Sequence, residues 1–170
     1  GLPLSINFAR AGFPVLGFDT DSQRVAQVND GEQVMQHIPC KAMRELAQGG
    51  EATADFARLG EADAVLICVP TPLDQHHQPD MSYVEAAADA IAATLRKGQL
   101  VVLESTTWPG TTRELLLPRL EASGLRAGED FFLAFSPERI DPGNQDWTTA
   151  NIPKVVGGID TTSTAVAQAL

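Results

Sequence analysis

Two kinds of hydrophobic pattern alternate along this chain. Short runs of uniformly apolar residues predict strands that are covered on both faces of a sheet, as in AVLICV at residues 64–69. Between them, apolar residues recur every three or four positions, which predicts amphipathic helices. The predicted strands are residues 15–19, 64–69, 99–104, 131–135 and 154–156.

The helices are predicted between these strands and have their own start and stop signals. Ser82 and Glu85 form a potential capping box, and Gly98 is expected to end the helix that they begin. Pro118 is expected to perturb the last helix because proline has no N–H to donate. The predicted helices are residues 1–10 (approximately), 22–28, 41–48, 82–95 and 112–121.

Strands that alternate with crossover helices form a parallel sheet with helices on both faces. At 170 residues the chain has the size of one domain. We therefore predict an α/β fold, a doubly wound, Rossmann-like and mostly parallel sheet that lacks its first strand. In such sheets ligands bind beyond the carboxyl ends of the strands. The loops at those ends are residues 19–21, 70–72, 105–110 and 136–139.

Asp19 follows the first predicted strand. A carboxylate at the end of the second strand of a βαβ unit accepts hydrogen bonds from both hydroxyls of an adenosine ribose and repels a 2′-phosphate, which favours NAD over NADP. The glycine fingerprint is expected about 20 residues upstream, and Gly1 is the residue found there. We therefore expect the chain to begin inside the phosphate loop. Alternatively, Asp19 is a turn residue, and Asp21 or Ser22 caps the next helix.

The other two polar loops also allow two interpretations each. The hydroxyls of the Ser-Thr-Thr segment at residues 105–107 either bind a cofactor or a reacting oxygen, or cap the helix that begins near Thr111. Glu138 either orients a water molecule as general base or forms a surface ion pair with Arg139.

We predict no metal site and no reactive cysteine. The adjacent histidines His76 and His77 lack the spacing with which metal ligands recur, so a solvated loop is the better interpretation. Cys68 lies inside an apolar strand and is interpreted as a core residue, whereas Cys40 is expected to begin a surface helix.

Twelve basic and 22 acidic residues give a net charge of −10 and a pI near 4.6. This balance argues against nucleic acid as a partner, since phosphate neutralisation needs clustered Lys and Arg. A small anionic ligand remains compatible, because helix N-termini bind phosphate without basic side chains. No apolar run approaches the ~20 residues of a membrane span, and no signal peptide is recognisable. Two unpaired thiols suit a reducing compartment, so we expect a cytoplasmic protein.

Several short segments together resemble the UDP-glucose/GDP-mannose dehydrogenase family, and most closely its UDP-N-acetylglucosamine or UDP-N-acetylmannosamine 6-dehydrogenase branch. The resemblance covers essentially the whole chain. The segments are Gly1-Leu2-Pro3, Gly17-Phe18-Asp19, His37-Ile38-Pro39, Cys68-Val-Pro-Thr-Pro72, Glu104-Ser-Thr-Thr-Trp-Pro-Gly-Thr-Thr112, Phe135-Ser-Pro-Glu-Arg139 and Asp141-Pro-Gly-Asn144.

The resemblance implies an oxidoreductase of polysaccharide biosynthesis that acts on a UDP-sugar. The enzyme would oxidise the C6 alcohol of the sugar to a carboxylate in two hydride transfers to NAD, through a cysteine-bound thioester. Asp19 and Arg24 would hold the adenosine ribose, Thr106 would lie near the nicotinamide and the reacting centre, and Glu138 would position the water that hydrolyses the thioester. The implied cofactor contacts are Gly1, Asp19, Arg24, Pro70, Thr71, Ser105 and Thr106.

The chain also departs from the family pattern. Members specific for glucose carry a second acidic residue where this chain has Pro142, which argues against a glucose substrate. Neither cysteine matches the nucleophile motif. The nucleophile, the central helix through which the family dimerises and the UDP-binding domain are expected outside residues 1–170.

We therefore predict an NAD-binding domain, truncated at both ends, of an enzyme that is a homodimer or larger. Alone, it is expected to bind NAD weakly and to turn over no substrate. Two alternatives stay open at this point. One is the cofactor domain of a small hydroxy-acid dehydrogenase, and the other is a non-catalytic nucleotide-binding module.

Overall fold

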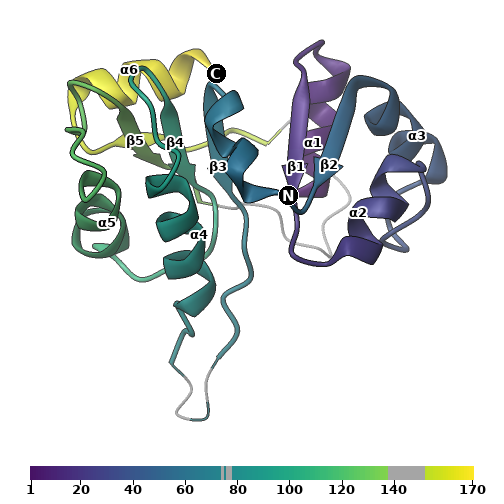
Figure 1. Cartoon of the computed structure of the whole chain (residues 1–170), viewed down its shortest axis with the longest axis horizontal. Coiled ribbons are helices and arrows are strands. Elements are labelled where there is room, and N and C mark those ends of the chain that lie inside the picture. The colour runs from purple at the N-terminus through teal and green to yellow at the C-terminus, as the bar shows by residue number, and fades with distance from the viewer. Residues whose placement is uncertain (74, 76–77, 138–151) are drawn as a thin grey trace. The chain divides into compact units, whose positions relative to one another are not determined.

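The computed structural model describes residues 1–73, 75, 78–137 and 152–170. Its contacts divide the chain into two compact units. The first consists of Gly1–Phe56 and Pro142–Ile152, and the second of Ala57–Asp141 and Pro153–Leu170. Each unit has its own parallel strands with helices packed on them (Figure 1).

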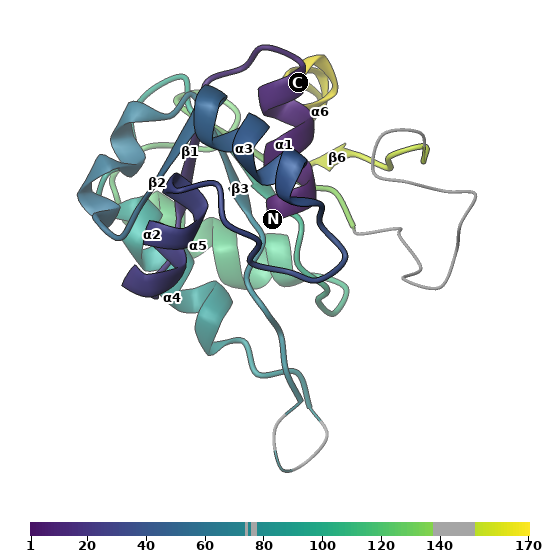
Figure 2. The ribbon, with the colours of Figure 1, turned by 90° about the vertical axis from the view of Figure 1, so that its right-hand side faces the viewer.

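The first unit contains two parallel strands, β1 (Val15–Phe18) and β2 (Gly50–Thr53). Helix α1 (Leu2–Arg10) precedes β1, and helices α2 (Ser22–Asn29) and α3 (Cys40–Gly49) connect β1 to β2. Figure 2 shows α1 and α3 side by side. Apolar side chains between these two helices form the core of the unit: Ile6, Ile38, Ala42, Met43 and Leu46.

The second unit contains a four-stranded sheet in the order β3-β4-β5-β6. The first three strands are parallel, and β6 is antiparallel to β5. The strands are β3 (Ala64–Ile67), β4 (Leu100–Leu103), β5 (Phe132–Phe135) and β6 (Gly157–Gly158). The helices are the 3₁₀-helix η1 (Phe56–Glu61), α4 (Ser82–Ala92), the π-helix η2 (Thr112–Leu116), α5 (Leu117–Glu121) and α6 (Thr161–Ala169).

Helices cover both faces of this second sheet. Alternate side chains of β4 and β5, including Val102 and Ala134, pack against Ala167 of α6. The intervening residues, such as Leu103 and Leu133, point to the opposite face and are fully buried. Figure 1 shows α4 and α5 on that side. The prediction of a mostly parallel α/β fold with helices on both faces is confirmed.

The predicted strands at residues 15–19, 64–69, 99–104 and 131–135 are confirmed, although each is one or two residues shorter. Two strands differ from prediction. β2 was not predicted because its sequence Gly-Glu-Ala-Thr carries no apolar run. The predicted strand at residues 154–156 is wrong, since the antiparallel pairing falls on Gly157 and Gly158, which carry no hydrophobic signal.

The ends of the predicted helices differ in instructive ways. α4 ends at Ala92, and its N-cap residue is Met81, which makes no side-chain capping hydrogen bond, so the predicted capping box of Ser82 and Glu85 is wrong. Instead, the Ser82 N–H donates to Asp80 Oδ1 at 2.9 Å, and hydrogen bonds from Ser82 lower the pKa of Asp80. Gly98 does not end α4 but lies in the turn before β4, with φ of +82°. The perturbation at Pro118 is confirmed, because the π-helix η2 gives way to α5 there.

Candidate functional site

Asp19 lies directly beyond the carboxyl end of β1. Its N–H donates to the Thr53 carbonyl at 3.2 Å, which fixes its backbone to the end of β2. Its Oδ1 accepts a hydrogen bond from the Asp21 N–H at 2.9 Å, and its Oδ2 lies 3.7 Å from Nη1 of Arg24. The structure therefore brings Asp19 and Arg24 within ion-pair distance of each other.

The turn and capping roles of the alternative interpretation are also present, with the turn at Asp19, which accepts from the Asp21 N–H, and the cap at Asp21. Asp21 is the N-cap of α2, and its side chain accepts from the N–H groups of Gln23 and Arg24. Asp19 keeps unused acceptor capacity, since a carboxylate offers about four lone-pair sites. The side chains of Asp19 and Arg24 are 35% and 49% exposed, so both reach solvent. Gly1 is exposed and directly precedes α1 in the same unit.

In the second unit, two predicted loops are joined by Ser105. Its hydroxyl donates to the Val69 carbonyl at 2.7 Å, and the residue is only 6% exposed. Ser105 thus ties the start of the loop after β4 to the end of the strand that leads into Pro70 and Thr71. Thr106, the next residue, is exposed to solvent, as is Pro70, and Thr71 is half-buried.

The capping hypothesis for this loop is wrong. No side chain caps the helix that begins at η2, and Thr111 donates its hydroxyl to the Trp108 carbonyl at 2.8 Å. The hydroxyl of Ser105 is used within the sheet, so it offers a ligand only acceptor capacity. Of the two residues in this loop with a predicted cofactor role, Ser105 is buried and Thr106 is exposed.

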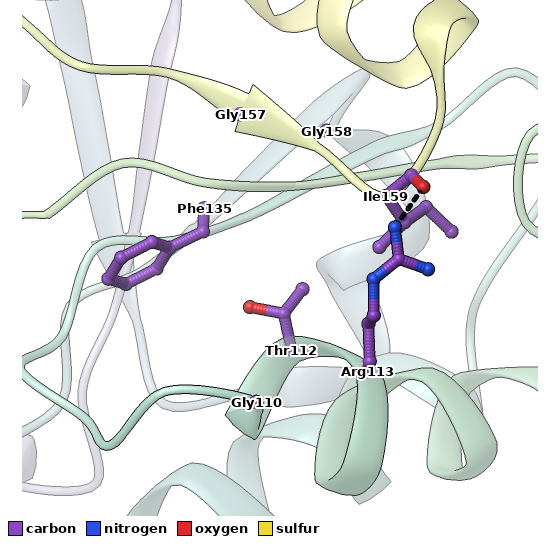
Figure 3. Close-up of a pocket in the computed structure, with 7 residues that line it drawn as sticks. All are labelled: Gly110, Thr112, Arg113, Phe135, Gly157, Gly158 and Ile159. Carbon is purple, nitrogen blue, oxygen red and sulfur yellow. Dashed lines mark hydrogen bonds between the residues drawn. The ribbon is translucent and has the colours of Figure 1, made fainter.

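A pocket of about 200 Å³ lies where the loop after β4 meets β5 and β6. Figure 3 shows the Thr112 hydroxyl facing into it, with Arg113 donating from Nη2 to the Ile159 carbonyl. This volume is below the ~300–1,000 Å³ typical of small-molecule pockets. The remaining lining residues are Gly110, Phe135, Gly157 and Gly158.

Asp19 lies at the carboxyl end of the parallel strand β1, and Ser105 and Thr106 lie just beyond that of β4, which is where open α/β sheets bind nucleotides. The sequence matches the profile described as "UDP-glucose/GDP-mannose dehydrogenase family, NAD binding domain" over residues 1–170. The chain belongs to this family. The family assignment of the sequence analysis and the NAD cofactor are confirmed, and the NAD-binding domain is the part that this chain represents.

Curated relatives of this NAD-binding domain carry related names. It is 37% identical over 159 residues to the UDP-N-acetyl-D-glucosamine 6-dehydrogenase of Pseudomonas aeruginosa. The aligned region covers 93% of this chain and 37% of that protein. It is 32% identical to the UDP-N-acetyl-D-mannosamine dehydrogenase of Pyrococcus horikoshii, over all of the chain and 41% of that protein. The chain thus spans about two fifths of the length of these relatives.

Solved structures agree with the fold. The NDP-N-acetyl-D-galactosaminuronic acid dehydrogenase of Methanosarcina mazei Go1 superposes with a TM-score of 0.87 at 34% identity. The match covers 98% of this chain and 38% of that one. The doubly wound architecture of the NAD-binding domain is therefore shared with this enzyme.

Several of the residues singled out in the sequence lie outside the part of the chain that the structure describes. Glu138, Arg139 and Pro142 lie outside the described residues, as do His76 and His77. Among the residues that the structure does describe, no three potential His, Cys, Asp or Glu ligands gather as a metal site. Within the same part of the chain, no helix has the length and apolar character needed to cross a bilayer.

The two cysteines occupy different environments in the NAD-binding domain. Cys40 is the first residue of α3 and is exposed, as predicted. Cys68 follows β3 directly and is partly buried. Burial, with a smaller contribution from the carboxylate of Glu104, raises the pKa of the Cys68 thiol. The predicted placement of Cys68 inside a strand of the core is therefore wrong, while its raised pKa disfavours the thiolate and argues against a nucleophilic role.

This difference predicts selective alkylation. In the folded protein at pH 8, iodoacetamide is expected to modify Cys40 at least about tenfold faster than Cys68, because only the exposed thiol supplies accessible thiolate. The rate at Cys68 should keep rising with pH beyond the ordinary thiol pKa, since its own pKa is raised. Peptide mass spectrometry after timed quenching measures both rates. Equal rates, or faster reaction at Cys68, would contradict this description.

Sequence reasoning missed an ion pair beside these loops. Lys154 Nζ lies 2.5 Å from Glu104 Oε2, and the Glu104 side chain is only 10% exposed. The two residues are 50 positions apart, so no local pattern could have joined them. The one available signal was a glutamate directly after the apolar run Leu100–Leu103. A buried carboxylate in that position requires a cation.

Proposed function

We propose that this domain serves a nucleotide-sugar 6-dehydrogenase that oxidises the C6 alcohol of a UDP-N-acetylhexosamine to the uronic acid with two molecules of NAD. The observation that carries the proposal is the 37% identity with the Pseudomonas aeruginosa enzyme across 93% of the chain. The Pyrococcus horikoshii relative, named for UDP-N-acetyl-D-mannosamine, supports the same class of substrate. Pro142, which stands where glucose-specific members carry an acidic residue, also argues against glucose as the sugar.

In this proposal the residues of the first unit bind the adenosine half of NAD. The Asp19 carboxylate accepts hydrogen bonds from the ribose hydroxyls, and Arg24, 3.7 Å from it, holds the carboxylate in place. The negative charge of Asp19 disfavours the 2′-phosphate of NADP. Gly1, which precedes α1, lies beside the pyrophosphate, where a side chain would hinder close approach of the backbone.

The residues of the second unit bind the nicotinamide half. Pro70 and Thr71 line the cofactor, and Thr106 contacts the nicotinamide and the reacting centre. Ser105 supports this loop through its bond to Val69. NAD, when bound, accepts the hydride from the sugar. Glu138 is proposed to orient the water that releases the product. The nucleophilic cysteine, a central dimerising helix and the UDP-binding domain are proposed to lie outside residues 1–170, in a cytoplasmic homodimer or larger oligomer.

An activity assay tests this function. The enzyme that carries this domain is expected to release two NADH per molecule of UDP-N-acetylglucosamine or UDP-N-acetylmannosamine. UDP-glucose is expected to react on the order of 10²-fold less efficiently, since a site built for the N-acetyl group loses contacts without it. Absorbance at 340 nm, with sugar as the limiting reagent, gives the stoichiometry.

Three results would contradict the proposal. One NADH per sugar would exclude the four-electron oxidation. Oxidation of small hydroxy acids in place of the UDP-sugars would favour the other class of dehydrogenase. Turnover of UDP-N-acetylglucosamine by residues 1–170 alone would show that the nucleophile does not lie elsewhere, because neither Cys40 nor Cys68 is assigned that role.

A further inference from the structure

A row of polar side chains crosses the carboxyl ends of three neighbouring strands in the second unit. Ile67, Leu103 and Phe135 lie in register on β3, β4 and β5. The residues that follow them keep that register, because the Glu104 N–H donates to the Ile67 carbonyl at 2.9 Å and the Ser136 N–H donates to the Leu103 carbonyl at 2.9 Å. The row thus consists of Cys68, Glu104 and Ser136, and Glu104 lies in its middle, beside Cys68.

Glu104 is a charged group in a nearly closed environment. Its side chain is 10% exposed and that of its partner Lys154 is 27% exposed, with 2.5 Å between Oε2 and Nζ. An unpaired buried carboxylate is strongly unfavourable, so removing the cation affects the protein more than removing a surface charge does. The ion pair Lys97–Asp130 offers the contrast, because Lys97 is 77% exposed.

The ion pair fixes the start of the loop that carries Thr106. Glu104 is followed by Ser105, whose hydroxyl donates to the Val69 carbonyl at 2.7 Å. The backbone that leads to Thr106 is thus held at two successive residues, by Lys154 through Glu104 and by the segment after β3 through Ser105. Thr106 itself is exposed. Its position therefore depends on these two anchors.

We infer that Lys154 is a positioning residue, which acts through Glu104 to hold the Thr106 loop in the conformation that binds the nicotinamide half of NAD. This inference rests on the proposed function, which places Thr106 at the nicotinamide. Lys154 itself touches no cofactor in this account. Its contribution is to keep the Glu104 carboxylate, and with it the first residue of the loop, at the end of β4.

Substitution of Lys154 by methionine tests this role, because methionine keeps the length of the side chain and removes the charge. Binding of NAD⁺ is compared with binding of ADP-ribose, which lacks the nicotinamide ring, by calorimetric titration of the protein. For Lys154→Met we expect NAD⁺ to bind about fivefold to tenfold more weakly, the equivalent of about one lost hydrogen bond. Binding of ADP-ribose should change less than about twofold, since the adenosine half has its own contacts.

Two further variants define the controls. Lys154→Arg keeps a cation for Glu104 and should restore most of the NAD⁺ affinity. Lys97→Met makes the same chemical change at an exposed ion pair near the start of β4 and should leave both ligands unaffected. If Lys154→Met does not fold, the double variant Glu104→Gln/Lys154→Met removes both charges and leaves no unpaired buried carboxylate. We expect the same selective loss of NAD⁺ affinity in that double variant.

The inference is overturned if the folded variant binds NAD⁺ as tightly as the wild type, or if NAD⁺ and ADP-ribose weaken equally. Equal weakening would indicate a general effect on structure. Both of these outcomes leave the proposed function intact. If the wild-type enzyme that carries this domain binds neither ligand, the proposed function fails as well, so the two failures are distinguishable.

Discussion

Replacement of Asp19 by asparagine is expected to weaken NAD⁺ binding by about tenfold to a hundredfold, the usual effect of losing hydrogen bonds to a charged group. Asparagine keeps the size of the side chain and an Oδ1 that accepts from the Asp21 N–H. It removes the charge that faces Arg24 and one of the two acceptors for the ribose hydroxyls. The ratio of NAD⁺ to NADP⁺ affinity should also fall, because the carboxylate no longer repels the 2′-phosphate. Fluorescence or calorimetric titration with both cofactors measures the two effects.

The matched control for this variant is Asp21→Asn. It changes the net charge by the same amount two residues away, and asparagine caps helices as well as aspartate does, so α2 should keep its start. Its NAD⁺ affinity is expected to stay within about threefold of the wild type. Equal losses in the two variants would mean that general electrostatics, and not a ribose contact at Asp19, accounts for the effect.

Replacement of Gly158 by alanine is expected to lower the free energy of unfolding by about 3 kcal/mol, and Tm by roughly 6 to 12 °C, as for overpacked core sites. A Cβ at this position would overlap the backbone nitrogen of Thr164 and lie 2.6 Å from the carbonyl carbon of Ser163. Both atoms belong to the first turn of α6, which packs on β4, β5 and β6. The helix would have to move away from the sheet to admit the methyl group. Thermal unfolding followed by circular dichroism measures the loss.

The neighbouring glycine provides the control. Among the residues that the structure describes, a Cβ on Gly157 would meet no atom within 4 Å, so Gly157→Ala should change the free energy of unfolding by less than about 0.5 kcal/mol. If Gly157→Ala destabilises the protein as much as Gly158→Ala does, the loss comes from the backbone preferences of the strand and not from the contact with α6.

The parts of the fold that could be predicted are those whose own sequence carries the signal. β3 is apolar along its whole length because both faces of the sheet are covered, and it was found on that basis. β2 and β6 could not be found in this way. Their residues, Gly-Glu-Ala-Thr and Gly-Gly, form strands because backbone groups of β1 and β5 pair with them, and pairing partners leave no periodic pattern in a sequence.

The same distinction between local signals and contacts with distant residues applies to the candidate site. The position of Asp19 at a strand end could be predicted from local spacing, and its contact with Arg24 follows from five residues of chain at the start of α2. The role of Ser105 could not, because its hydroxyl bonds to the carbonyl of Val69, which lies two residues beyond the end of β3 and 36 residues earlier in the chain. Lys154 was predicted only as a strand residue. Its pairing with Glu104 depends on a sheet that brings distant strand ends together.

A crystal structure of the protein with NAD⁺ would show directly whether Asp19 binds the adenosine ribose. Both ribose hydroxyls are expected to lie within about 3 Å of the Asp19 carboxylate oxygens, with the carboxylate still beside Arg24. Density that places the ribose away from Asp19, with the carboxylate contacting only the Asp21 N–H and solvent, would contradict this expectation.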